Sequence, residues 1–283
     1  MTTIFLFDNQ AAAATLAAST TASASMGVAN LVNPQRSKFH RSTAGTSCTY
    51  NVTLPAARGA DYLRLLDLNL STAGQIRVQS WSDSLGGSAP GVDITVSPSL
   101  YIKNDGTAVR WGEGAWGDGT WGVATATQYN VRNATLVPLG SVRTEKYWRI
   151  TLTDVAGTYQ QCGGLFLGLA FRLTYGIGYG WTMRRESRSP EEEALGGQIY
   201  SQPRDGRLLL DARFASLTDV ERTNLAIVLQ EFFDQRRPFD VWLFAENSNR
   251  ALTTSAYCTF TSPGLSHGDK NHNVFTFGIK EEL

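Results

Sequence analysis

The sequence predicts a mainly β protein: an N-terminal jelly-roll β-sandwich followed by an α+β domain in which one helix packs on a sheet. Three observations support this. Short segments of alternating polar and apolar residues, separated by Gly, Ser and Asp, recur up to residue 175. Only residues 218–238 carry a convincing helical pattern, and further alternating segments follow them. Because 283 residues favour two domains, we expect them at residues 1–175 and 176–283.

The N-terminal strands are expected in a simple order. A short first strand ends before Asp8, and a second, at residues 48–54, should stop at Pro55, which has no N–H for a sheet. Residues 164–173 are almost all apolar, as in a strand buried on both faces. The remaining predicted strands lie at residues 62–70, 75–81 and 147–153.

In the C-terminal half, a strand at 206–215 precedes the helix. Thr218 and Glu221 have the spacing of a capping box, and Pro238 ends the helix. One stripe at helical spacing is apolar and is expected to face the sheet; it consists of Leu225, Val228, Leu229, Phe232 and Phe233. Three strands are expected after the helix, at residues 239–244, 257–261 and 274–279.

Charge and hydropathy exclude several classes of protein. The 25 basic and 25 acidic residues give a formal net charge of zero without a long basic run, so nucleic-acid binding is not expected. No run of about eighteen apolar residues is present, so membrane insertion is not expected. The first 28 residues lack a basic segment before their apolar stretch, which argues against a signal peptide and for synthesis in a cytoplasm.

No enzyme, cofactor or metal is expected. The sequence lacks a G-x-S-x-G elbow, a P-loop and a dinucleotide fingerprint that opens a helix. Glu113 and Asp118 could be considered as a pair of glycosidase carboxylates, but a glycine-rich segment would hold them poorly. The cysteines and histidines form no metal-binding cluster, and the thiols are expected to be buried and free; these residues are Cys48, Cys162, Cys258, His40, His267 and His272.

Residues 111–122 form the most unusual segment. Trp111, Trp116 and Trp121 recur every five residues, and each is followed by glycine. This period fits neither a helix face nor a strand face, so we expect a shaped loop. Its rings either pack the loop onto the sheet or contact a ligand or partner protein, and Trp81 joins these three as a candidate contact.

A charged segment opens the second half of the chain. We expect a hairpin arm at residues 182–200, in which Arg184, Arg185, Glu186 and Arg188 are candidates for contact with a neighbouring subunit. The alternative is a solvated hairpin or linker.

Two parts of the chain carry motifs whose order along the sequence resembles that of known families. Phe39-His40-Arg41-Ser42, Tyr147-Trp148-Arg149-Ile150 and the Gly-Leu-Phe-Leu-Gly stretch at 164–168 resemble the galactose-binding-like (discoidin-type) jelly roll, over residues 25–173. The resemblance implies that loops at one end bind sugars or partner proteins. It identifies no sugar-binding residue in this chain.

Residues 180–283 resemble the ring-forming domain of tail-tip and distal tail proteins of long-tailed phages. The resemblance rests on Leu217-Thr218-Asp219-Val220-Glu221, Phe232-Phe233 and Phe239-Asp240-Val241-Trp242-Leu243-Phe244. The chain departs from this family in its large N-terminal β domain, because distal tail proteins usually carry such a domain after the ring domain.

These resemblances imply a structural virion protein in the tail tip or baseplate of a phage. Its partners would be further copies of the chain in a ring, the tail tube, the tail-tip hub and other baseplate proteins. Arg184, Arg185, Glu186 and Arg188 would then lie in the ring-interface arm. The alternative is a lectin-like, carbohydrate-binding module that attaches to a host surface polysaccharide.

Overall fold

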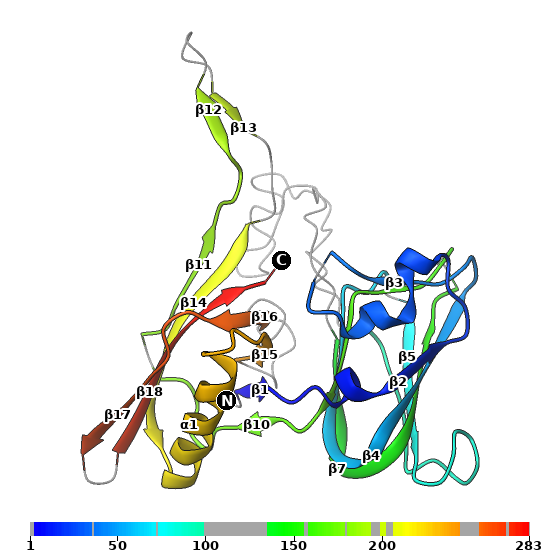
Figure 1. Cartoon of the computed structure of the whole chain (residues 1–283), viewed down its shortest axis with the longest axis horizontal. Helices are drawn as coiled ribbons and strands as arrows, with labels where there is room; N and C mark the ends of the chain where they lie inside the picture. The colour runs from blue at the N-terminus through cyan, green and yellow to red at the C-terminus, as the bar shows by residue number, and fades with distance from the viewer. Residues whose placement is uncertain are drawn as a thin grey trace, which may run out of the picture.

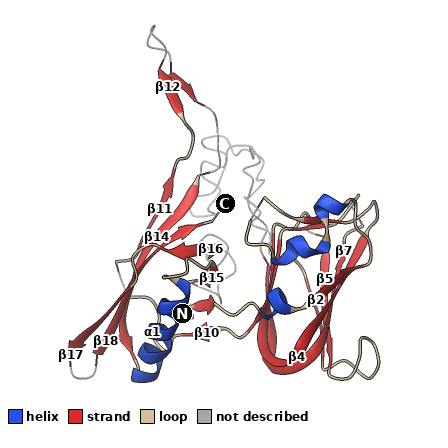
Figure 2. Cartoon of the chain, in the orientation of Figure 1, coloured by secondary structure: helices blue, strands red, loops and turns tan. Residues whose placement is uncertain are grey.

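The computed structural model describes residues 3–98, 135–243 and 255–282, apart from 36, 72, 156–157, 179, 194–198, 202–205 and 270–271. The predicted fold class is confirmed: the chain is mainly β, with an N-terminal sandwich and a C-terminal sheet on which one helix packs (Figure 2). Each part has its own hydrophobic core.

The sandwich is built around a six-stranded antiparallel sheet. Its strands run in the order β2-β4-β7-β5-β6, and β9 also pairs with β4. Their bounds are β2 Thr15–Ala18, β4 Ser47–Leu66, β5 Gln75–Trp81, β6 Val92–Val96, β7 Thr135–Thr153 and β9 Gly164–Gly168. The smaller elements are η1 Gln10–Ala13, η2 Ala24–Met26, η3 Val28–Val32, and the paired strands β3 His40–Arg41 and β8 Gln161–Cys162.

The expectation that Pro55 ends a strand is wrong. Strand β4 passes through it and unites the two strands predicted at 48–54 and 62–70. Its pairing with β7 shifts register between Thr53 and Arg58, so the irregularity takes Pro55 out of the ladder. Strand β4 pairs with β2 in its first half and with β9 in its second.

The second sheet has eight strands in the order β10-β1-β15-β16-β18-β14-β11, and β17 also pairs with β18. Their bounds are β1 Ile4–Leu6, β10 Phe171–Arg172, β11 Thr182–Glu186, β14 Arg207–Leu217, β15 Phe239–Trp242, β16 Ser255–Phe260, β17 Gly264–Asp269 and β18 His272–Glu281. Among the described residues, four strands follow the helix, one more than predicted. The missed strand is β17, a short polar segment.

The order of the chain through the two parts differs from the predicted succession of domains. Strand β1 pairs with β10 and β15, so the N-terminal strand belongs to the second sheet (Figure 1). The sandwich is inserted between β1 and β10. The apolar stretch predicted as one strand at 164–173 accordingly divides into β9, in the sandwich, and β10, in the second sheet.

Helix α1 (Asp219–Phe232) forms as predicted. The Thr218 hydroxyl accepts from the Glu221 amide at 3.2 Å, and the Glu221 carboxylate accepts from the Thr218 amide at 2.7 Å. Leu225 and Phe232 are buried against the sheet. Phe233 was expected on the same stripe but is 40% exposed, because one residue after Phe232 the helix has turned by about 100°.

A buried seam joins the sandwich to the second sheet. Its apolar residues are Ile4, Leu6, Leu66, Phe166, Trp242 and Tyr257. Within it, Arg64 of β4 forms an ion pair with Asp240 of β15, and these residues are 2% and 0% exposed. The Trp242 indole donates to Oδ2 of Asp240 at 2.7 Å, so charge and hydrogen bonding both fix this contact.

Candidate functional site

The charged segment forms a hairpin arm that extends away from both sheets (Figure 1). Its base is the pairing of β11 with β14 in the large sheet. Its distal part is a separate two-stranded ribbon, made of β12 (Glu191–Glu193) and β13 (Ile199–Ser201). The candidate residues Arg184, Arg185 and Glu186 lie in β11, and Arg188 follows it.

Strand β11 lies at the edge of the large sheet. Among the described strands it pairs only with β14, so its other side presents backbone groups that a further strand could pair with. The side chains of Arg184, Arg185 and Arg188 are exposed, and Met183 beside them is 44% exposed. The arm therefore offers an open strand edge with exposed arginines beside it.

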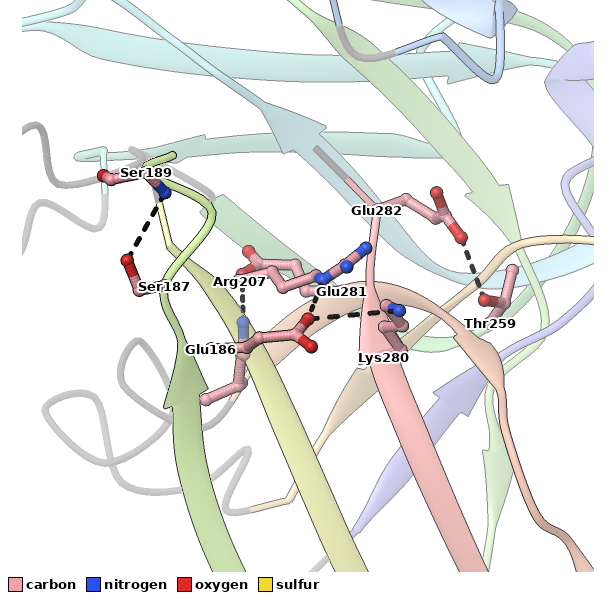
Figure 3. A network of polar contacts seen from close by, with 9 residues as sticks. Glu186, Ser187, Ser189, Arg207, Thr259, Lys280, Glu281 and Glu282 are labelled. Atoms are coloured by element: carbon pink, nitrogen blue, oxygen red, sulfur yellow. Dashed lines mark hydrogen bonds and ion pairs between the residues drawn. The ribbon is translucent and has the colours of Figure 1, made fainter. Parts of the chain in front are cut away.

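A polar network fastens the base of the arm (Figure 3). Glu186 of β11 forms an ion pair with Arg207 of β14, and the Lys280 ammonium lies 4.0 Å from the same carboxylate. The Glu281 carboxylate accepts from the Leu208 amide at 2.9 Å. The hydrogen bond from Arg207 is the main reason that the pKa of Glu186 lies below its usual value.

Sequence reasoning did not find Arg207 and Lys280. Arg207 lies directly opposite Glu186 in the β11–β14 register, and Lys280 reaches the same carboxylate from β18. Opposite charges that face each other across a hairpin are a usable signal. Here that signal depends on the register, which the charged sequence alone does not define.

The tryptophan candidates have different outcomes. Trp111, Trp116 and Trp121 lie outside the described residues, so their role stays a prediction. Trp81 is only 3% exposed, and its indole donates to the carbonyl of Ser88 at 3.0 Å. The guanidinium of Arg149 lies 5.2 Å from its ring centroid. Trp81 therefore packs within the domain and has little free face for a ligand.

The outward side chains of the sandwich sheet form a polar face, which we define by Thr49 and Asn51 of β4, Arg149 and Thr151 of β7, Arg77 and Gln79 of β5, and Asp93 of β6. Arg77 donates to both carboxylate oxygens of Asp93, at 2.8 and 2.6 Å. Strand pairing brings these residues together from segments far apart in the sequence.

The cysteines are free and buried, as predicted. His40 is also buried: its Nδ1 lies 3.0 Å from the Tyr50 hydroxyl, and burial lowers its pKa. Among the described residues, no group of three or more His, Cys, Asp and Glu side chains could hold a metal ion. No described helix is long and apolar enough to cross a membrane.

No protein-family description and no curated protein matches the chain. Similar solved structures include a chitosan-binding module of a chitosanase/glucanase from Paenibacillus sp. IK-5, with 17% identity, a TM-score of 0.37, and coverage of 56% of this chain and 98% of that one. A family 32 carbohydrate-binding module from C. perfringens in complex with galactose has 10% identity, a TM-score of 0.36, and coverage of 59% and 98%.

A Ruminococcus gnavus fucosidase in complex with fucose has 10% identity and a TM-score of 0.39, and the match covers 58% of this chain and 27% of that one. The fold of the chain is defined by its strand pairing. None of these structures is a phage tail protein.

Proposed function

We propose that the protein is a structural subunit that joins copies of itself through the hairpin arm, as part of the tail tip or baseplate ring of a long-tailed phage. The observation that carries the proposal is the arm itself. Strand β11 is an edge strand, and the ribbon β12–β13 carries the hairpin beyond the large sheet. Exposed Arg184 and Arg185 flank the open edge.

An arm of this kind suits head-to-tail assembly. A contact between two different surfaces, repeated around an axis, closes a ring, and pairing of edge strands between copies consumes an otherwise hazardous edge. The sequence resemblance of residues 180–283 to tail ring domains suggests where such a ring would lie. The proposal places the protein in the virion, with tail-tube, hub and baseplate proteins as neighbours, and gives it no catalytic step.

The register of the arm provides a direct test. Glu186 pairs with Arg207, so replacing residues 187–206 by Asn-Gly would close a two-residue hairpin and leave the base pairing in place. We expect the full chain to form higher oligomers in sedimentation velocity, or rings on purified particles in electron microscopy, and the shortened variant to form neither. Equal assembly by both chains, or absence of the protein from purified particles, contradicts the proposal.

A second candidate function is carbohydrate binding by the sandwich domain. The polar face favours it, because it gathers amide, hydroxyl and guanidinium groups on one surface of the sheet. Both functions are compatible if the sandwich binds a host surface polysaccharide from an assembled ring. A glycan array with the full chain and with Trp116→Ala is the test. Binding lost in a folded variant supports a role for the tryptophan segment, and no binding to any glycan contradicts this function.

A further inference from the structure

We propose that Arg149, on the polar face, binds the carboxylate of an acidic sugar, such as a uronic acid within a polysaccharide. The inference rests on the second candidate function, carbohydrate binding, and names its substrate class. It is independent of assembly through the arm.

Two contacts hold the guanidinium of Arg149 in place. Its Nε donates to Oδ1 of Asn51 at 3.1 Å, and its planar group lies over Trp81 at 5.2 Å from the ring centroid. The side chain is half-buried, and within the described part of the chain its Nη1 and Nη2 have no hydrogen-bond acceptor. A guanidinium held in this way loses little conformational freedom when it binds a ligand.

Gly86 of the neighbouring loop lies close to these two nitrogens. A Cβ added to Gly86 would lie 3.8 Å from Nη1 and 3.9 Å from Nη2, which is ordinary van der Waals contact. Gly86 has a φ of 78°, a left-handed conformation that glycine adopts without strain. Glycine at this position therefore places no side chain beside the guanidinium.

The second arginine of the face provides an internal comparison. Arg77 already donates two hydrogen bonds to Asp93, which also accepts one from Gln79 at 3.2 Å. Asp93 is therefore already paired within the face, while Arg149 has no carboxylate partner among the described residues. A planar carboxylate matches the two terminal donors of arginine.

Groups for the rest of a sugar lie beside Arg149. Asn51 and Gln79 occupy the positions directly opposite it on the two neighbouring strands. Among the described contacts, the Asn51 Nδ2 and the Gln79 Oε1 make no hydrogen bond, so one donor and one acceptor remain for hydroxyl groups. A carboxylate next to ring hydroxyls is the chemistry of a uronic acid.

The test uses the full chain in isothermal titration calorimetry with a galacturonic acid oligomer. We expect the oligomer to bind, and its affinity to fall as the salt concentration rises. Arg149→Gln should lower the affinity about tenfold or more, because it removes a charged hydrogen-bonded pair. Arg213→Gln, which changes an exposed arginine of β14 outside the polar face, is the matched control and should bind as the wild type does. Circular dichroism reports whether each variant folds.

A ligand-side control does not depend on folding of the variants. The methyl-esterified oligomer keeps the sugar ring but lacks the charge, and we expect it not to bind. Equal binding of the ester, or tighter binding of a sulfated oligomer, overturns the carboxylate site but leaves carbohydrate binding intact. No binding of any acidic or neutral oligomer overturns both. If Arg213→Gln weakens binding as much as Arg149→Gln, the assignment to Arg149 is overturned.

Discussion

The large sheet has two ends that differ in how they are held. At one end, β1, β10 and β15 meet the sandwich across the buried seam, where Arg64 and Asp240 are 2% and 0% exposed. At the other end, β11 carries the arm, and the side chains of Glu186 and Arg207 are 42% and 27% exposed. Both ends use an ion pair between strands, but the pair at the seam is buried and the pair at the base of the arm is exposed to solvent.

This difference indicates different roles for the two ends of the sheet. The seam orients the sandwich, and the arm is available for association with a partner. A buried pair tolerates little displacement, because each charge would be left in an apolar site without its partner. The seam therefore fixes the sandwich relative to the sheet. An exposed pair is weak and is screened by salt, so the arm can exchange its contacts for those of a partner.

The largest expected effect is at the seam. Asp240→Asn keeps the shape of the side chain and an acceptor for Trp242, but it removes the negative charge with which Arg64 pairs across the buried seam. We expect the free energy of unfolding to fall by about 3–5 kcal/mol. Urea denaturation of the full chain, followed by circular dichroism, measures it.

Asp93→Asn is the matched control, since Asp93 also pairs with an arginine but lies on the exposed polar face. It should leave the denaturation midpoint unchanged. Equal losses in the two variants would show that burial does not distinguish the seam from surface pairs. An Arg64→Met, Asp240→Leu double variant should recover much of the stability, because an apolar pair leaves no buried charge at this contact.

The second expected effect concerns Glu221, which ties the helix to the segment leaving the sandwich. Its carboxylate accepts from the Thr174 amide at 2.6 Å and from the Thr218 amide at 2.7 Å. Burial raises its pKa, but these hydrogen bonds outweigh burial, and the pKa lies below its usual value. We expect Glu221→Gln to cost about 1 kcal/mol at pH 7, the size of a typical helix cap.

The pH dependence of this effect has a definite sign. The pKa is lower in the folded state, so the stabilisation is present above the unfolded value of about 4.3 and is lost as pH falls through the folded one. Thermal unfolding from pH 7 to pH 3 should show the wild type and Glu221→Gln converging at low pH. Glu231→Gln, on an exposed position of the same helix, should match the wild type throughout; a constant gap for Glu221→Gln would rule out this linkage.

The sequence predicts local structure better than the arrangement of the two parts. The capping box of Thr218 and Glu221 is a signal within four residues, and the structure contains it. Ile4–Leu6 carries no such signal, because three apolar residues suit either sheet and their partners lie more than 160 residues away. The insertion of the sandwich was therefore not predictable from the residues alone.

The candidate site shows the same limit. The charged hairpin could be expected from composition, whereas the pairing of Glu186 with Arg207 and Lys280 depends on register. Trp81 was a candidate ligand contact because of its residue type, but the structure buries it under Arg149. A sequence does not reveal which face of a strand is covered by its own neighbouring loop.

The smallest expected effect is at the base of the arm. Glu186→Gln removes the charge that Arg207 and Lys280 share, but these groups are open to water and the rest of the β11–β14 ladder stays intact. We expect no measurable change in the global denaturation midpoint, and faster hydrogen exchange of the β11 amides, because local opening needs only the edge strand to separate. Hydrogen exchange read by mass spectrometry, with the peptide from β15 as internal reference, measures both ends of the sheet at once. If exchange rises equally in β11 and β15, the two ends open together, and the distinction between a fixed seam and an adaptable arm fails.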